Sequence, residues 1–373
     1  MAQYTFNDVK LAGCSVVLGE NLHRIEDEPQ YWNNDPFRLA RLKDLLGMDS
    51  RYVASPQTTT SDLCLQAATS LMQALAISPS DVSAVISITQ TPDYRAPGNA
   101  YVLHNALGLG RDCVALDVCQ GCAGFVYGLW LAGMMASTGG GGVLLCAGDT
   151  LSRLAHSRDY TTAPLFGDAG SAAWVKSCPG AGPMHFLLQS NGHELQKLYV
   201  PAGGARQPSS EQTAREITSE DGSVRSLDSL HMDGAGVFSF AMSEQPALLR
   251  QMLEYAKMQP EEIDYLVLHQ ANRYIVQTIA KKAGFPASKV PSQAFGRYGN
   301  QNAASIPGVL CDELALQLAQ RKAEVVLQGF GIGLSWGACQ LRLENMLCIP
   351  PQVYGGKPCP QQTPQQSPQQ TPL

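Results

Sequence analysis

The segment Leu116–Phe125, LDVCQGCAGF, changes backbone conformation twice within a short stretch. An apolar run ends near Val118, the Gln-Gly pair that follows favours a tight turn, and an uncharged apolar helix is expected over Ala123–Ala136. A strand that leads through a short turn into a helix is typical of α/β proteins. The segment therefore predicts an α/β fold and places Cys122 at the start of a helix.

The same alternation of strand and helix continues on both sides of this segment. The expected elements are the strands Val82–Thr89, Val114–Val118, Val143–Ala147 and Ser171–Lys176, the helix Ala100–Leu107, and a hairpin around Gly167–Gly170. Strands and helices in alternation predict a parallel or mixed sheet that helices cover on both faces.

The second half of the chain repeats the plan of the first. The run that begins at Pro79, PSDVSAVIS, resembles PEEIDYLVL at Pro260, about 180 residues later. VLLCAG at Val143 resembles VVLQG at Val325 at nearly the same offset. Two matches at one spacing indicate a duplicated α/β unit, and an active site is expected between the two halves.

Composition excludes several classes of partner. The 373 residues carry a net charge of −6, which gives no reason to expect nucleic acid or an anionic membrane surface. Val118–Gly148 contains no charged residue, but its dense apolar part is too short to span a bilayer, so a buried helix is expected. The first residues do not resemble a signal peptide, and the cysteines mostly stand alone within apolar runs, so we expect a cytoplasmic protein.

Four segments are expected along the chain. Residues 1–180 form the first half, and residues 181–230 form a connection with a polar surface excursion from 201 to 230. Residues 231–348 form the second half. Residues 349–373 are rich in Pro and Gln and are expected to be a disordered tail.

Cys122 is the candidate nucleophile. The first N–H groups of a helix lack backbone partners and carry partial positive charge, so they favour a thiolate and can later stabilise an oxyanion. The alternative is that Cys122 is a small buried apolar residue. Cys119 and Cys113 are expected to be structural. Cys119 and Cys122 do not indicate a zinc site, because no second pair of ligands follows them in the sequence.

His269 and Asn300 are the other two candidates. His269 follows the apolar run Leu266–Leu268 in the phrase HQAN, and the carboxyl end of a buried strand is the usual active-site edge of an α/β sheet. Asn300 lies in GNQNAASIP, where the duplication assigns it the place that Cys122 has in the first half. Its alternative role is a helix cap, and the residues alone favour that role.

Together these phrases resemble the β-ketoacyl-acyl-carrier-protein synthase III family of the thiolase-like superfamily. The matching phrases, in the order and spacing of the family, are CAGF at Cys122, FGDAGSAA at Phe166, HMDGAGVF at His231, HQAN at His269, GN with AASIP at Asn300, and GFGIGLSWG at Gly329. The resemblance covers about residues 8 to 345. It implies a five-layered α/β/α/β/α fold, built from two pseudo-duplicated halves, and a homodimer.

The resemblance also implies a ping-pong acyl transfer. Cys122 would accept an acyl group from a coenzyme A or carrier-protein thioester, and a malonyl-type thioester would then lose carbon dioxide and attack it. His269 and Asn300 would donate hydrogen bonds to the thioester oxygen, His269 as a neutral ring with its Nε2–H toward the substrate. The backbone N–H groups of Cys122 and Ile332 would form a second oxyanion site. No cofactor and no metal are implied.

Further substrate contacts are implied at Gly331, Gly333, Arg153 and Ala96. Arg153 matches an arginine that stacks on the adenine of coenzyme A, whereas Arg41 replaces the tryptophan on its other face, which makes a carrier-bound donor more plausible. Ala96 replaces a phenylalanine that crosses the dimer interface and limits the acyl pocket, so we expect acyl groups larger than acetyl. Docking of an acidic acyl carrier protein is expected at Arg273, Lys281 and Lys282.

Three other functions remain open from the sequence. The first is acyl transfer to an oxygen or nitrogen acceptor, with His269 as general base, although relatives with this activity often lose the asparagine that is intact here as Asn300. The second is a non-catalytic partner subunit of a condensing heterodimer, although such subunits usually lack the nucleophile. The third is a plant-type polyketide synthase, which shares the QGC and GFG phrases, although HQAN and the Trp336-Gly337 ending favour synthase III.

Overall fold

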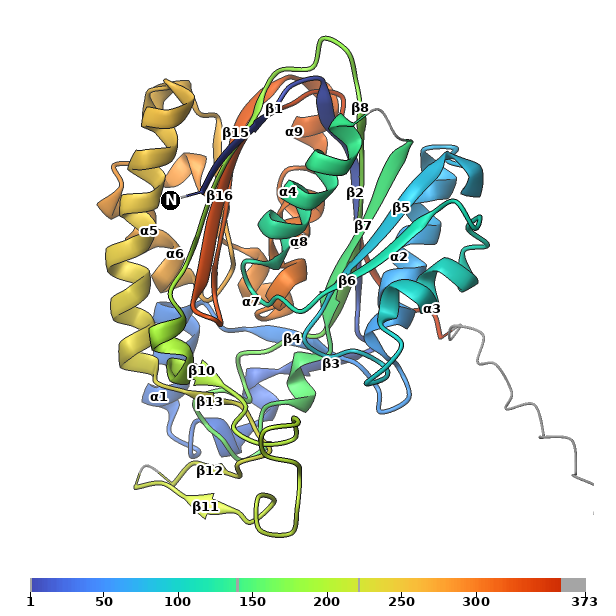
Figure 1. Ribbon diagram of the computed structural model, residues 1–373. Coiled ribbons are helices and arrows are strands. Elements are labelled where there is room, and N and C mark those ends of the chain that lie inside the picture. Colours follow the sequence, from blue (N-terminus) through green and yellow to red (C-terminus); the bar gives the residue numbers. More distant parts are fainter. Residues whose placement is uncertain (1, 139–140, 221, 357–373) are drawn as a thin grey trace, which may run out of the picture.

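Two mixed β-sheets form the centre of the molecule (Figure 1). The computed structural model describes residues 2–138, 141–220 and 222–356. The six-stranded sheet has the order β17 (Leu347–Val353), β2 (Val9–Leu18), β8 (Ala169–Ser177), β7 (Gly142–Asp149), β5 (Val82–Ile88) and β6 (Val114–Val118). The five-stranded sheet has the order β1 (Ala2–Phe6), β9 (Met184–Ser190), β16 (Ser335–Leu343), β15 (Ala323–Gly331) and β14 (Tyr265–Leu268).

Helices lie between the sheets and on both outer faces, which gives the expected five layers (Figure 1). The inner layer is formed by α4 (Gly124–Ser137) and α8 (Ser305–Asp312), with α7 (Ala294–Tyr298) and α9 (Ala315–Gln320) beside them. The six-stranded sheet is covered by α2 (Thr60–Ala74) and α3 (Asn99–Ala106), and the five-stranded sheet by α5 (Gly234–Ala256) and α6 (Arg273–Lys282). The expected strands and helices are therefore confirmed to within about two residues, as boundary assignments allow.

The duplication is visible in matching pairs of elements. β5 and β14 each follow a short 3₁₀ turn, η4 (Pro79–Asp81) and η7 (Pro260–Glu262), and each turn begins with proline and carries a capping box. β5 pairs in parallel with β7, and β14 pairs in parallel with β15. The two sequence matches therefore fall on equivalent elements of the two halves.

The two halves exchange strands, which the expected division into residues 1–180, 181–230 and 231–348 did not include. The first strand, β1, pairs with β9 in the five-stranded sheet, and the last strand, β17, pairs with β2 in the six-stranded sheet. β9 also lies inside the segment that was expected to be only a connection. Each end of the described chain is thus held in the sheet of the opposite half.

The tail that was expected to be disordered, residues 349–373, was predicted to begin too early in the chain. Residues 349–353 belong to β17, the edge strand of the six-stranded sheet, and the register shifts between Ile349 and Gln352. Pro350 and Pro351 lie at this shift, and an edge strand with a bulge tolerates prolines because it does not need every N–H donor. Residues 357–373 lie outside the described residues.

The hairpin expected at Gly167–Gly170 is also wrong. β7 and β8 are antiparallel neighbours, but a long segment, residues 150–168, connects them. The excursion of residues 201–230 packs on this segment, because Arg225 donates to the buried Asp159 over 2.7 Å and Leu230 N donates to Leu154 O over 2.7 Å. Its tip carries the short hairpin of β11 (Ile217–Thr218) and β12 (Val224–Arg225), at the bottom of Figure 1.

Smaller elements complete the side of the molecule that faces this excursion (Figure 1). They are α1 (Pro36–Arg41), the single π-helical turn η3 (Leu42–Leu46), and the paired strands β3 (Asn21–Arg24) with β4 (Ser50–Val53) and β10 (Leu198–Tyr199) with β13 (His231–Met232).

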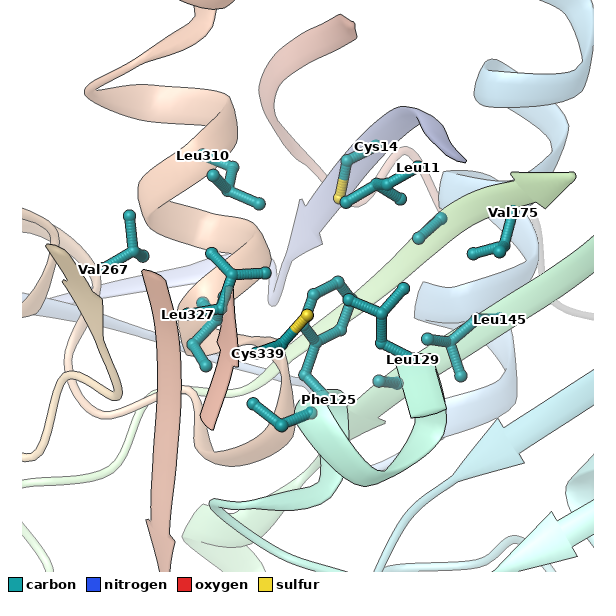
Figure 2. Close-up of a cluster of buried hydrophobic side chains, with 14 of the residues drawn as sticks. Leu11, Cys14, Phe125, Leu129, Leu145, Val175, Val267, Leu310, Leu327 and Cys339 are labelled. Carbon is teal, nitrogen blue, oxygen red and sulfur yellow. The ribbon is translucent and has the colours of Figure 1, made fainter. Parts of the chain in front are cut away.

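The largest apolar cluster lies where the inner helices meet both sheets (Figure 2). Phe125 and Leu129 of α4 contact strands of the six-stranded sheet on one side and residues near Leu327 and Cys339 on the other. α4 is therefore the buried helix expected for the uncharged segment. Among the described residues, no helix is long and apolar enough to cross a membrane.

Removing the Phe125 side chain should destabilise the fold. Phe125 is fully buried, so Phe125→Ala should lower the free energy of unfolding by about 3–5 kcal/mol in urea denaturation. The matched control is Phe37→Ala, because Phe37 is 87% exposed and its loss should change the free energy by less than about 0.5 kcal/mol. Equal effects of the two substitutions would contradict the assignment of the core.

Candidate active site

Cys122 lies in the turn between β6 and α4. The helix begins at Gly124 with Ala123 as its N-cap, so Cys122 is two residues before the helix and does not open it. The side chain is 9% exposed. The backbone N–H groups of Cys122 and Ile332 lie close enough to the sulfur to act on the pKa of its thiol, which they lower. Those are the two donors that were expected to form an oxyanion site.

The electrostatic environment of Cys122 differs from the expected one. Burial, with a smaller contribution from the Asp149 carboxylate, raises the pKa of the thiol to about 12 despite the two backbone donors. The expectation that the helix terminus favours a thiolate is therefore wrong for the free protein. The reason is that the sulfur is desolvated, and desolvation of a thiolate outweighs the partial charge of nearby N–H groups.

His269 directly follows β14 and is almost fully buried, with 1% of its surface exposed. Burial lowers the pKa of the imidazole to about 3, so the ring is neutral at physiological pH. Its Nδ1 lies 2.7 Å from Ser305 Oγ, which leaves Nε2 as the other ring nitrogen. Ser305 Oγ also lies 2.9 Å from the carbonyl oxygen of Asn302, so the single hydroxyl hydrogen has two possible acceptors.

Asn300 is held by backbone and side chain together. Its N–H donates to Leu165 O over 2.8 Å, and its carbonyl accepts from Gly167 N over 3.1 Å. The side-chain Oδ1 accepts from the backbone N–H of Asn302 over 2.9 Å, at the start of the 3₁₀ turn η9 (Asn302–Ala304). The N-cap of η9 is Gln301, so Asn300 is not a helix cap; its side-chain oxygen is used within the turn, and the Nδ2 amino group is left as a donor.

One cavity of about 360 Å³ joins the three residues. Cys122, His269 and Asn300 all line it, although they come from different elements and lie far apart in the sequence. Its other walls are mainly apolar and come from η3, the segment 150–168, the end of the excursion, α5 and α6; they include Leu45, Leu46, Leu151, Leu165, Phe166, Leu198, Leu230, Met232, Val237, Phe238, Ile275 and Phe330. Such a cavity suits an extended, mostly apolar ligand with one polar centre.

Gly331 and Ile332 line the same cavity. A Cβ atom on Gly331 would lie 2.8 Å from the Sγ of Cys122, so a larger residue would displace the thiol. Gly333, with φ of +137°, forms the turn that follows, outside the cavity lining. Within the described residues, no group of three His, Cys, Asp or Glu side chains could hold a metal ion.

Comparisons with known proteins agree with this geometry. The family model for 3-oxoacyl-[acyl-carrier-protein (ACP)] synthase III matches residues 116–192, and the model for its C-terminal part matches residues 253–343. A β-ketoacyl-[acyl-carrier-protein] synthase III of Rhizorhabdus wittichii is 36% identical over 305 residues, which cover 79% of this chain and 88% of that protein. The chain belongs to the 3-oxoacyl-[acyl-carrier-protein] synthase III family.

Further relatives extend this similarity over most of the chain. The synthase III of Symbiobacterium thermophilum is 33% identical over 329 residues, which cover 88% of this chain and 94% of that protein. The crystal structure of a 3-oxoacyl-(acyl-carrier protein) synthase from Burkholderia xenovorans superimposes with a TM-score of 0.88 at 31% identity, covering 94% of this chain and 99% of that one. The thiolase-like fold is thus confirmed, and the chain is a condensing transferase of the synthase III type.

Besides Gly333, two other substrate residues expected from the synthase III family, Arg153 and Ala96, lie outside the cavity lining. Arg153 is exposed, and its Nη2 donates to the carbonyl oxygens of Ser55 over 2.8 Å and Thr58 over 2.5 Å. Ala96 is exposed in the loop that follows β5. Neither position contacts the Cys122 cavity within one chain.

The expected carrier-docking residues differ in solvent exposure and in their hydrogen bonds within the chain. The Arg273 guanidinium donates to the carbonyl oxygens of Lys43 over 2.9 Å and Asp44 over 2.7 Å, so it fastens η3 to α6. Lys282 is exposed, although its Nζ lies 3.3 Å from Met242 O, and Lys281 is exposed on the same helix. The lysines thus present more positive charge to solvent than Arg273 does.

The sequence did not single out Gln90 and Asn302, which also line the cavity. Gln90 comes two residues after β5, so the argument that identified His269, a polar residue at the carboxyl end of a buried strand, would have identified it too. Asn302 has φ of +49°, a left-handed conformation that asparagine tolerates better than most residues. The sequence signal that could have identified Asn302 is its position two residues after Asn300, in the same polar turn.

The pKa of Cys122 predicts how its reactivity depends on pH. Since only the thiolate reacts and the thiol remains protonated far above neutrality, alkylation of Cys122 by iodoacetamide should accelerate about tenfold per pH unit from pH 7 to 9.5 without a plateau. Peptide-level mass spectrometry separates this site from the other cysteines, and Cys122→Ala supplies the blank. A plateau below pH 8 would show that the backbone donors outweigh burial.

Proposed function

We propose that the chain catalyses a decarboxylative condensation between an acyl thioester and a malonyl-type thioester. The observation that carries the proposal is the single cavity that brings a thiol, a neutral imidazole and a carboxamide NH₂ together behind apolar walls. Relatives named as 3-oxoacyl-[acyl-carrier-protein] synthases support the same reaction.

In the first half-reaction, Cys122 Sγ attacks the carbonyl carbon of the acyl thioester. The new S–C bond replaces the one to coenzyme A or to the carrier, and the thiol proton leaves with the departing thiol. The backbone N–H groups of Cys122 and Ile332 stabilise the negative charge on the acyl oxygen during this exchange. Because the pKa of the free thiol is high, the proton is transferred to the departing thiol during the exchange itself and is not lost beforehand.

In the second half-reaction, a malonyl-type thioester loses carbon dioxide to give an enolate. The amino group of Asn300 and the Nε2–H of His269 stabilise the enolate oxygen. This role requires the ring hydrogen on Nε2, so that Nδ1 accepts from the Ser305 hydroxyl group, which in the free protein donates to Asn302 O over 2.9 Å. The enolate carbon then attacks the acyl carbonyl carbon, and the C–S bond to Cys122 breaks to give a 3-oxoacyl thioester and a thiolate, which takes up a proton from solvent to restore the thiol.

The acyl group is expected to be larger than acetyl, and its donor to be a carrier-bound thioester at least as readily as a coenzyme A thioester. Leucine, methionine and phenylalanine side chains form most of the cavity wall, and Ala96 leaves open the space that a larger side chain would fill across a dimer. The Nη2 atom of Arg153 is engaged with backbone carbonyls. Lys281 and Lys282 provide positive charge for an acidic carrier protein.

We also propose a homodimer through the edge of the six-stranded sheet. β6 is an edge strand, and Val114 and Leu116 on it are exposed apolar residues. Tyr94 and Tyr101 add exposed aromatic surface from the neighbouring loop and α3. An unpaired edge with apolar neighbours favours pairing with a second copy of the same edge.

Acyl transfer to an oxygen or nitrogen acceptor is the main competing function. It requires a general base, and a pKa of about 3 makes His269 a weak one. The Asn300 amino group can donate a hydrogen bond to an enolate oxygen, and an enolate forms only in the condensation reaction. Both observations favour condensation.

Incubation with acyl thioesters should give a covalent acyl adduct on Cys122. Intact-mass measurement should detect the adduct with acyl groups of four or more carbons, and Cys122→Ala should abolish it. Cys119→Ala is the matched control and should load normally. A chain that takes no acyl group would be a non-catalytic subunit, and loading of acetyl alone would contradict the larger pocket.

Discharge of the adduct should separate condensation from simple transfer. His269→Ala and Asn300→Ala should keep the adduct but slow its malonyl-dependent discharge about 100-fold or more, because each removes one donor to the enolate oxygen. Release of carbon dioxide and a 3-oxoacyl product is the measurement. Discharge by an alcohol or amine, independent of the malonyl thioester, would favour the competing function.

A further inference from the structure

Gln90 introduces a further side-chain carboxamide into the cavity, besides those of Asn272, Asn300 and Asn302. Its position is fixed by the backbone, because Gln90 N donates to Asp149 Oδ1 over 2.7 Å. The side chain reaches the turn before the nucleophile, where a Cβ atom on Gly121 would lie 2.3 Å from Gln90 Oε1 and 2.6 Å from Ile332 Cγ2. Gly121 therefore permits the Gln90 amide to lie beside Cys122, next to the residue whose N–H contacts the thiol.

Asn302 determines which way this amide faces. Its Nδ2 donates to Asp149 Oδ2 over 2.8 Å and to Gln90 Oε1 over 3.2 Å, which uses both hydrogens of the amino group. Since the Oε1 atom of Gln90 accepts the hydrogen bond from Asn302, the Nε2 amino group of Gln90 is left to donate to another group. Within the described part of the chain, Nε2 has no hydrogen-bond partner and is not among the buried unpaired atoms, and Gln90 lines the cavity.

The orientation of Asn302 follows in turn from Asp149. This carboxylate is buried at the end of β7, and its Oδ1 accepts from the backbone N–H of Gln90 and Thr91 and from the hydroxyl groups of Thr89 and Thr91. Burial raises the pKa of Asp149 to about 7, and these donors oppose that rise by favouring the ionised form, which can only accept hydrogen bonds. Asn302 must then present its amino group to Asp149 and to Gln90.

We propose that Gln90 is a specificity-determining residue whose Nε2 amino group donates a hydrogen bond to an oxygen on the acyl group carried by Cys122. The ligand class is an acyl thioester with a hydroxyl or carbonyl oxygen on the first carbons after the thioester, in preference to a plain alkyl acyl group. Gln90 and Ile332 both lie against Gly121, and the N–H of Ile332 belongs to the acyl oxyanion site of the proposed function, so we assign the contact to the acyl group and not to the malonyl-type thioester. The inference deepens the proposed function and rests on it for the identity of the acyl group.

Binding in a Cys122→Ala background tests this proposal without requiring catalysis. The probes are phosphopantetheine thioesters, the part that coenzyme A and a carrier share, with butanoyl compared against its 2-hydroxy, 3-hydroxy, 3-oxo and 4-oxo forms. Calorimetry should show at least one oxygenated form binding about tenfold more tightly than butanoyl, the value of one hydrogen bond. Gln90→Met keeps the side-chain length and should remove this preference, so that the oxygenated forms and butanoyl bind with affinities within about twofold of each other.

Two further variants control the test. Asn302→Gly tolerates the left-handed backbone but removes the amide that orients Gln90, so it should also reduce the preference. Gln277→Met, at an exposed position of α6 outside the cavity, should have no effect. Equal affinities for all probes in the protein with Gln90, no binding of any probe, or a Gln90→Met effect confined to the malonyl thioester would overturn the proposal. Failure of wild-type Cys122 to form an adduct would instead overturn the proposed function.

Discussion

The burial of α4 and α8 between the two sheets is the constraint on which the site depends. Each helix must contact both sheets, so each can start only at the edge where the strands of its own half end. The turn before α4 carries Cys122, and the turn before α8 carries Asn300. Because the two helices lie side by side in one layer, these turns meet at a common edge, and the end of β14 adds His269.

Exclusion of water gives this site its electrostatic character. Burial raises the pKa of Cys122 and lowers the pKa of His269, so the thiol and the imidazole are both neutral in the free protein. The chemistry is therefore left to fixed hydrogen-bond donors, which are strongest where no solvent competes. Asp149, a buried carboxyl group beside the site, accepts several hydrogen bonds and, through Asn302, orients the donors of its neighbours.

Contacts between distant segments form the rest of the cavity. The segment 150–168 and the excursion 201–230 are held together by the Arg225–Asp159 ion pair and by backbone hydrogen bonds, and each contributes apolar residues to the wall. Arg273 fastens η3, so that Leu45 and Leu46 close another part of it. The walls are therefore set by polar anchors outside the cavity, whereas the inner helices set the positions of the residues at its centre.

The sequence by itself determined the order of strands and helices, the duplication, and Cys122 as a candidate nucleophile, because hydrophobic periodicity, turn residues and strand ends are local signals. His269 could be chosen for the same reason, whereas Asn300 needed the family resemblance, since a cap and an oxyanion donor look alike in sequence. Only the tertiary structure decided the exchange of β1 and β17 between sheets, the partners of Arg153 and Arg273, and the inward-facing amide of Gln90. It also reversed the expected pKa of Cys122. All of these depend on desolvation and on hydrogen bonds between groups that are remote along the chain, which no local pattern encodes.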